Sequence, residues 1–230
     1  MRLDGRASDE LRAVEMILGY QEFAEGSALI RLGRTQVLCA ATVEEGVPPW
    51  VTSQGWLTAE YTMLPRSTRI RTPRQVSARE TEIQQLVGRA LRASLDLDAL
   101  GRHTITIDCD VLQADGGTRT AAITGGYLAL ALALRQLERS HRVQHGIWHA
   151  PVAAISVGLV DGELLLDLCY EEDIRATVDC DVVLNADGHL VEVDAQAAVP
   201  FSQEQLERML QLARPGIERL LAMQRQALGS

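Results

Sequence analysis

The 230-residue chain contains no lysine, because all 22 of its cationic residues are arginines. This absence excludes chemistry that needs a lysine amine, such as Schiff-base formation or phosphate binding by a P-loop lysine. Positive charge is also in the minority, since 31 acidic residues give a formal net charge of −9. That balance argues against a protein that wraps nucleic acid and against attachment to a membrane through basic patches.

Cysteine is scarce as well. The chain has four, each standing singly with no C-x-x-C pair: Cys39, Cys109, Cys169 and Cys180. We therefore expect reduced, buried thiols. The N-terminus is charged from Arg2 onward and has no apolar stretch typical of a signal peptide. The longest apolar-leaning stretch, 121–134, is too short and too rich in glycine to cross a bilayer. Together these features predict a cytoplasmic protein without a membrane segment.

The pattern of apolar residues predicts an α+β chain. Strands are expected at residues 28–32, 35–42, 55–61, 103–112, 152–159, 164–168, 173–184 and 190–193. Helices are expected at residues 80–95, 119–139 and 203–226, the last capped by Ser202. The two halves are similarly rich in strands, and no linker divides them. We therefore predict a single domain over residues 1–230.

One candidate site is the segment 115–120, D-G-G-T-R-T, which opens a predicted helix. Two glycines allow a ligand to approach the backbone closely, and the free N–H groups of a helix N-terminus attract anions. Thr118 adds a hydroxyl donor, and Arg119 adds a planar guanidinium suited to phosphate. The alternative is an ordinary turn before a helix.

Arginines gather in a second segment. Between Arg66 and Arg92 there are seven arginines and two glutamates, a net charge of +5 in a chain of −9. Arg79 stands at the start of a predicted helix, where the helix dipole and the guanidinium can together hold an oxyanion. The alternative is a solvated loop or a salt-bridged interface.

A third segment, 171–181, is acidic. In a strand its alternation would place Asp173, Asp179 and Asp181 on one face. Carboxylates gathered in this way suit a hard divalent cation. Six residues of straight strand span roughly 20 Å, so Asp173 and Asp179 share an ion only if the chain bends between them. The alternative is an exposed acidic strand face.

In their order and spacing, these motifs resemble the ribonuclease PH family over nearly the whole chain. The matching segments are residues 2–6 and 11–12, 24–27, 37–39, 43–48, 54–56 (QGW), 58–61 (TAEY), 63–66 (MLPR), 82–84, 113–120, 172–173 and 200–201. The resemblance implies an α+β fold, a duplicated strand-rich ribonuclease PH-type domain that is ribosomal protein S5 domain 2-like.

The resemblance also implies a function. Members of the family are phosphorolytic 3′→5′ exoribonucleases that trim tRNA precursors, release nucleoside diphosphates and assemble as a hexameric ring, a trimer of dimers. It implies that Arg79, Thr118 and Arg119 hold inorganic phosphate, with Gly117 shaping the loop. Asp173 and Asp179 match the acidic pair that supports Mg²⁺ and catalysis. The resemblance places four further arginines on the RNA path: Arg66, Arg69, Arg71 and Arg74.

Some segments depart from the family pattern. Cys169 stands where many members have an acidic residue, Asp181 where asparagine is usual, and the arginine-bearing loop is several residues shorter. The stretch 193–199 replaces a customary Gln-Gly-Thr-Ala-Glu-Gly. The altered stretch 193–199 keeps one alternative open, a non-catalytic RNA-binding ring subunit related to exosome components. Hydrolytic cleavage is a further alternative, which the presence of Arg79, Thr118 and Arg119 disfavours. The net charge fits a trimming enzyme, because a local positive patch is enough to hold one RNA end.

Overall fold

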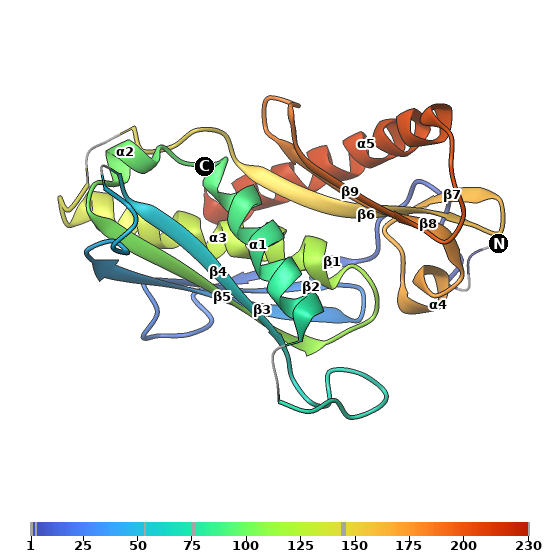
Figure 1. Ribbon diagram of the computed structural model, residues 1–230, viewed down its shortest axis with the longest axis horizontal. Coiled ribbons are helices and arrows are strands. Elements are labelled where there is room, and N and C mark those ends of the chain that lie inside the picture. Colours follow the sequence, from blue (N-terminus) through green and yellow to red (C-terminus); the bar gives the residue numbers. More distant parts are fainter. Residues whose placement is uncertain (1, 3, 53, 75–76, 144–145, 230) are drawn as a thin grey trace.

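Two β-sheets with a long helix between them form the computed structural model, which describes every residue except 1, 3, 53, 75–76, 144–145 and 230 (Figure 1). The first sheet has the order β1-β2-β3-β5-β4, with β1 Val14–Leu18, β2 Gly26–Leu32, β3 Thr35–Glu45, β4 Trp56–Met63 and β5 His103–Gln113. The second has the order β7-β6-β8-β9, with β6 Val152–Val160, β7 Glu163–Leu166, β8 Ala176–Asn185 and β9 Leu190–Ala197. All pairings are antiparallel except that of β4 with β5.

Five helices complete the described structure: α1 Ala78–Arg92, α2 Leu97–Leu100, α3 Thr118–Arg139, α4 Tyr170–Asp173 and α5 Gln203–Leu228. The long helix α3 contacts strands of both sheets, while α1 packs on β4 and α5 packs on β6 (Figure 1). Each half of the chain thus supplies one sheet followed by one long helix. The larger hydrophobic cluster contains buried residues of both sheets. No helix among the described residues is both long enough and apolar enough to cross a membrane.

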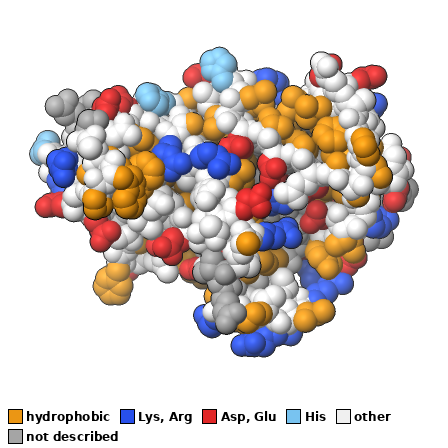
Figure 2. Space-filling view, in the orientation of Figure 1, with side chains coloured by type: hydrophobic (Ala, Val, Ile, Leu, Met, Phe, Trp, Pro, Cys, Tyr) orange, Lys and Arg blue, Asp and Glu red, His pale blue; other side chains and the backbone are white. Residues whose placement is uncertain are grey.

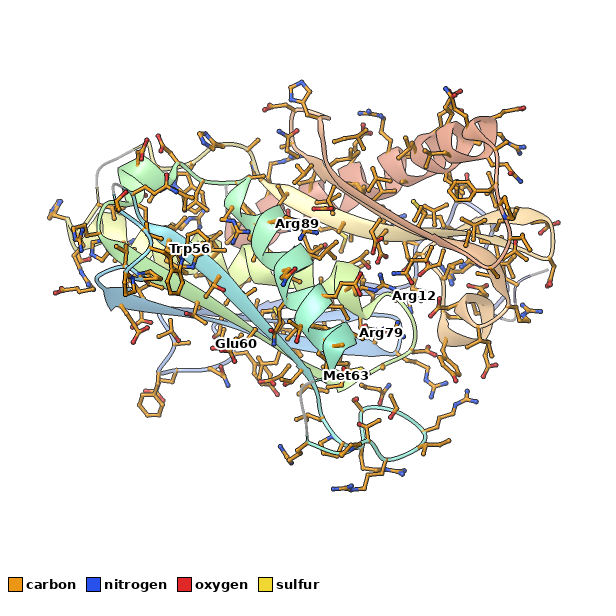
Figure 3. The ribbon with its side chains drawn as sticks, viewed as in Figure 1. Arg12, Trp56, Glu60, Met63, Arg79 and Arg89 are labelled. Atoms are coloured by element: carbon orange, nitrogen blue, oxygen red, sulfur yellow. The ribbon has the colours of Figure 1, made fainter. Side chains whose placement is uncertain are left out.

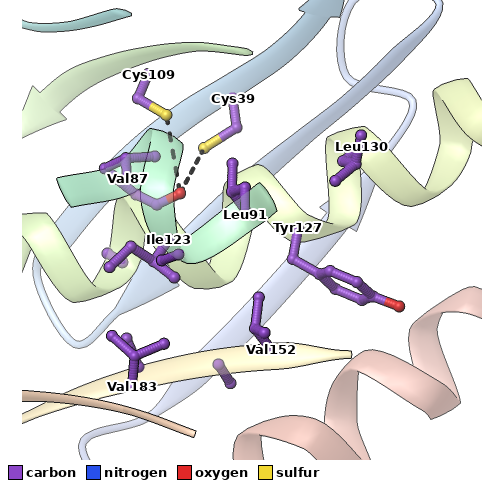
Figure 4. Packing of buried hydrophobic residues seen from close by; sticks show 14 of the residues in the cluster. Cys39, Val87, Leu91, Cys109, Ile123, Tyr127, Leu130, Val152 and Val183 are labelled. Carbon is purple, nitrogen blue, oxygen red and sulfur yellow. Dashed lines mark hydrogen bonds between the residues drawn. The ribbon is translucent and has the colours of Figure 1, made fainter. Parts of the chain in front are cut away.

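The α3 helix is buried on nearly all sides because its sequence is apolar on nearly all sides. Small residues allow the neighbouring strands to come close. A Cβ added to Gly26 in β2 would lie 2.1 Å from the Ala129 carbonyl oxygen of α3. The Cys39 and Cys109 thiols, from neighbouring strands, both donate to the Ala122 carbonyl oxygen at 3.8 Å (Figure 4). Cys39, Cys109 and Cys180 are buried free thiols, as expected, whereas Cys169 is half-buried.

The structure corrects one predicted strand. Residues 173–184 do not form one continuous strand, because Asp173 ends the short helix α4 and β8 begins only at Ala176. The Glu172 carboxylate accepts hydrogen bonds from the Cys169 N–H at 3.0 Å and the buried Arg2 guanidinium at 2.7 and 2.8 Å. These bonds close the helical turn, and the Arg2 partner is 170 residues away, outside the reach of a local pattern.

Candidate active site between the two sheets

A cavity of about 680 Å³ lies where the start of α3, loop residues 66–73, the start of α1, α4 and β8 meet. It is lined by residues from all three segments singled out in the sequence. In the space-filling view, acidic and arginine side chains lie side by side near the middle of this face (Figure 2). The structure bends after α4, and both Asp173 and Asp179 line this cavity, so the straight-strand separation does not apply to them.

Gly116 and Gly117 form the turn that begins α3. Both have positive φ angles, +78° and +65°, and a Cβ on Gly116 would lie 2.3 Å from the Leu168 carbonyl oxygen. Gly117 is the N-cap of α3, and the first N–H groups of a helix have no partner within the helix. The turn therefore offers backbone donors and the positive end of the α3 dipole to the cavity, an arrangement suited to an anion.

Two side chains from the first half of the chain hold this turn in place. Arg12 donates to the Asp115 carbonyl oxygen at 2.6 Å, and Thr35 donates to the Gly116 carbonyl oxygen at 2.6 Å. Arg12 is buried, and its ion pair with Asp167 at 2.6 Å outweighs burial and raises the pKa of its guanidinium. The sequence analysis placed Arg12 in a segment that matches the family but assigned it no role.

Tyr61 orients Thr118. Its buried hydroxyl donates to Thr118 Oγ1 at 2.8 Å, and burial raises the pKa of Tyr61 to about 12. Tyr61 therefore stays protonated at neutral pH and acts as a donor, which leaves the Thr118 hydrogen free to point to a ligand oxygen. Sequence reasoning placed Tyr61 in a matching motif without assigning it a role.

Arg119 is surrounded by carboxylates. Its Nη1 lies 3.0 Å from Asp194 Oδ2 and 3.1 Å from Asp181 Oδ2, and its Nη2 lies 3.6 Å from Asp179 Oδ2. Burial opposes the charge of the guanidinium, but the carboxylates outweigh it and raise the pKa of Arg119. Asp194 was not among the predicted site residues, although its place on β9 opposite Asp181 puts both on one sheet face.

Burial raises the pKa values of two carboxylates in this cavity, to about 6 for Asp179 and about 7 for Asp181. The charge of Asp173 raises that of Asp179 further, while Arg119 and Arg79 oppose the shift. Burial also raises the pKa of Asp173. Burial thus disfavours the charged forms of Asp173, Asp179 and Asp181, which favours a proton or a cation beside these groups.

The pair Asp173 and Asp179 suits Mg²⁺ held jointly with a substrate. Mg²⁺ prefers oxygen ligands and is commonly bound through one or two carboxylates together with substrate phosphates. Within the described part of the chain, no group of three or more acidic, His or Cys side chains has the arrangement of a complete metal site. The two carboxylates therefore fit a shared ion rather than a protein cage.

The predicted arginines occupy different places. Arg79 lines the cavity from the first turn of α1, whose N-cap Ser77 forms a capping box with Glu80 (Figure 3). Arg66 and Arg69 also line the cavity, whereas Arg71 and Arg74 lie exposed farther along the same loop.

Arg69 sits at the cavity mouth. It pairs with Glu171 at 2.5 Å and lies 5.5 Å above the centre of the Tyr170 ring. Tyr170 is itself 42% exposed and lines the cavity, so it offers an aromatic surface beside a cation. Sequence reasoning did not single out Tyr170.

Comparison with known proteins gives consistent matches. Domain 1 of the 3′ exoribonuclease family matches residues 10–136, and domain 2 of the same family matches residues 150–216. A protein named ribonuclease PH from Moorella thermoacetica is 53% identical over 100% of this chain and 95% of its own length. Another of that name, from Solibacter usitatus, is 50% identical over 99% of both chains.

Solved structures share the fold at low sequence identity. Rice Rrp46 is 20% identical, with a TM-score of 0.83 over 99% of this chain and 100% of that one. A chain of the Archaeoglobus fulgidus exosome, solved with RNA bound to its active site, is 24% identical, with a TM-score of 0.81 over 95% of this chain and 91% of that one.

Proposed function

Because this chain belongs to the ribonuclease PH family, we infer that it is a phosphate-dependent 3′→5′ exoribonuclease that releases nucleoside diphosphates. The observation that carries the inference is one cavity that combines Thr118, Arg119 and Arg79 with Asp173 and Asp179. A helix N-terminus and two guanidiniums suit a phosphate dianion, and the carboxylate pair suits a divalent cation beside it.

The reaction joins an oxygen of inorganic phosphate to the phosphorus of the last internucleotide phosphodiester. The bond from that phosphorus to the 3′ oxygen of the preceding nucleotide breaks, and this oxygen receives a proton. The products are a nucleoside 5′-diphosphate and an RNA that is shorter by one nucleotide. Phosphate is a weak anionic nucleophile that approaches an anionic ester, so the first need is to neutralise and orient it.

Different side chains have different roles in this reaction. The Thr118 hydroxyl, fixed by Tyr61, and the α3 N-terminus orient phosphate, while Arg79 and Arg119 neutralise it. Asp173 and Asp179 would hold Mg²⁺ together with substrate phosphate oxygens. When bound there, Mg²⁺ supplies positive charge that stabilises the charge developing on the leaving 3′ oxygen and the ester oxygens.

We propose that the RNA 3′ end enters along the loop that carries Arg66, Arg69, Arg71 and Arg74. The net charge of +5 over residues 66–92 provides a local attraction for phosphates within an acidic body. The family relation supports 3′-extended tRNA precursors as the substrate, a homo-hexameric ring built as a trimer of dimers, and action in the cytoplasm.

The direct test is incubation of the purified protein with a 3′-extended tRNA and Mg²⁺, with and without inorganic phosphate. We expect nucleoside diphosphates only when phosphate is present, and loss of the reaction when EDTA removes the metal. Equal release of nucleoside monophosphates without phosphate would show hydrolysis and overturn the proposal. Sedimentation velocity tests the hexamer separately, because it needs no activity.

A non-catalytic RNA-binding ring subunit is the second candidate. The ion pairs of Arg119 with Asp181 and Asp194 favour this candidate. Asp194 lies in the divergent stretch 193–199. RNA binding without release of diphosphates under any metal condition would support this candidate instead.

A further inference from the structure

The contacts of Arg119 have a consequence for the phosphate site. Both carboxylates nearest to this guanidinium meet the same nitrogen, Nη1, at 3.0 Å from Asp194 and 3.1 Å from Asp181. The contact with Asp194 is a hydrogen bond, whereas that with Asp181 is an ion pair, so Asp194 takes up one of the two N–H groups of Nη1. The Arg119 side chain is only 12% exposed and lines the cavity, so an anion that binds there meets a guanidinium already paired with Asp194.

The β-sheet register places these two carboxylates opposite each other. Asp181 in β8 pairs directly with Asp194 in β9, and Asp179 lies two residues before Asp181, on the same face. Like charges directly opposite each other in a sheet repel. The Arg119 guanidinium pairs with both carboxylates and thereby offsets part of their repulsion. If a phosphate dianion drew Arg119 away, the two carboxylates would repel each other and would also repel the dianion.

The two carboxylates differ in their freedom to move. The Asp181 side chain is 5% exposed, whereas that of Asp194 is 28% exposed and lies on β9, one of the two edge strands of its sheet. Asp194 is therefore the carboxylate that can leave Arg119 for solvent. Resting on the proposed function, we propose that Asp194 competes with inorganic phosphate for Arg119 and thereby sets the affinity of the enzyme for phosphate.

The opposite role would be that Asp194 positions Arg119 for phosphate. The substitution Asp194→Asn removes the charge of this side chain and keeps its shape, and the two roles predict opposite changes in the affinity for phosphate. In Asp194→Asn, a competitor loses its charge and phosphate binds more tightly, whereas a positioning residue loses its hold and phosphate binds more weakly.

The decisive measurement is isothermal titration of the RNA-free protein with inorganic phosphate, because it needs no turnover. We expect the Kd for phosphate in Asp194→Asn to fall by about 3- to 10-fold, the effect of removing one partly exposed charge beside a bound anion. In diphosphate release, KM for phosphate falls by the same factor, while kcat and KM for RNA stay within about twofold.

Glu192→Gln is the matched control. Glu192 lies two residues before Asp194 on the same face of β9, but it pairs with Arg89, at 3.1 Å. Its removal changes the net charge by the same amount and should leave the Kd for phosphate nearly unchanged.

An unchanged or higher Kd in Asp194→Asn overturns the proposal, as does an equal fall in Glu192→Gln, or phosphate binding by neither the parent nor Asp194→Asn. Thermal unfolding of each variant verifies that it is folded. If the parent binds phosphate but releases no diphosphate, the proposed function fails while the titration still decides the role of Asp194.

Discussion

At the scale of single residues, the Thr118 hydroxyl owes its orientation to Tyr61, which lies on a different element of the fold. A hydroxyl can rotate freely, and a fixed donor on its oxygen restricts the direction of its own hydrogen. The Tyr61 hydroxyl can supply that donor at all ordinary pH values, since burial raises its pKa to about 12.

Tyr61→Phe removes this donor and leaves the ring in the core. We expect the free energy of unfolding to fall by about 1 kcal/mol, the net contribution of one hydrogen bond. KM for phosphate should rise several-fold with kcat nearly unchanged, because the hydroxyl orients phosphate before the reaction. Tyr127→Phe is the control, since Tyr127 is a buried tyrosine of α3 outside the cavity lining. Equal effects of both variants on KM would contradict the assignment.

Asp179→Asn tests the carboxylate pair. Removing this charge weakens the proposed magnesium site but leaves the arginines of the entry loop intact. We expect kcat to fall by about 100-fold or more, while the Kd for RNA changes by less than about threefold. Turnover and fluorescence anisotropy with a labelled 3′-extended tRNA measure the two effects. An equal loss of RNA binding and turnover would show that Asp179 acts in RNA binding instead.

The sequence located the residues that line the cavity better than the residues that support them. The segment 115–120 could be found because glycines before a helix have a local signature. The roles of Arg12, Tyr61 and Asp194 could not, because each acts on a partner between 57 and 103 positions away. Such contacts depend on strand register and helix placement, which a single sequence does not specify.

At the scale of elements, the turn before α3 joins the two halves of the site. Gly116 packs against the backbone of residues 168–170 just before and within α4, so the phosphate turn and the segment that carries Asp173 support each other. The periodic elements, including α3 and β5, could be predicted from their patterns. The short helix α4 could not, since its stability depends on the distant pair of Glu172 with Arg2.

Gly116→Ala tests this packing against a matched control. Gly162 also has a positive φ, +85° beside +78° for Gly116, but a Cβ there would have open space around it. We expect Gly162→Ala to lower the free energy of unfolding by about 1–2 kcal/mol, through backbone strain alone. Gly116→Ala should lower it by about 3 kcal/mol or more and weaken phosphate binding, because its Cβ would also meet the Leu168 carbonyl oxygen. Urea denaturation measures both, and similar losses would show that the close contact is unimportant.

At the scale of the whole molecule, the N-terminal segment ties the two halves together. Arg2, Arg6 and Arg12 reach the carboxylates of Glu172 and Asp167 in the second half. The α+β class and the order of the longer elements could be predicted, because they follow from local patterns, whereas β1, α2 and α4 were not predicted. The way the halves face each other could not, since buried pairs such as Arg2 with Glu172 leave no trace in periodicity.

The pair of Arg2 with Glu172 makes stability depend on pH. Burial alone would raise the pKa of Glu172, but hydrogen bonds from Arg2 and from the Cys169 N–H outweigh it and lower the pKa below 4.5. A carboxyl group whose folded pKa is depressed stabilises the protein above its unfolded pKa, and loses that contribution as the pH falls through the folded value.

We expect Glu172→Gln to lower the free energy of unfolding at pH 7 by about 1–3 kcal/mol, since Arg2 then lacks a charged partner. That deficit should shrink as the pH falls below about 4.5, because the parent protein loses the same charge by protonation. Urea denaturation between pH 7 and pH 3.5 measures the deficit, with exposed Glu22→Gln as the control. A deficit that stays constant over this range would show that the charge of Glu172 contributes nothing to folding.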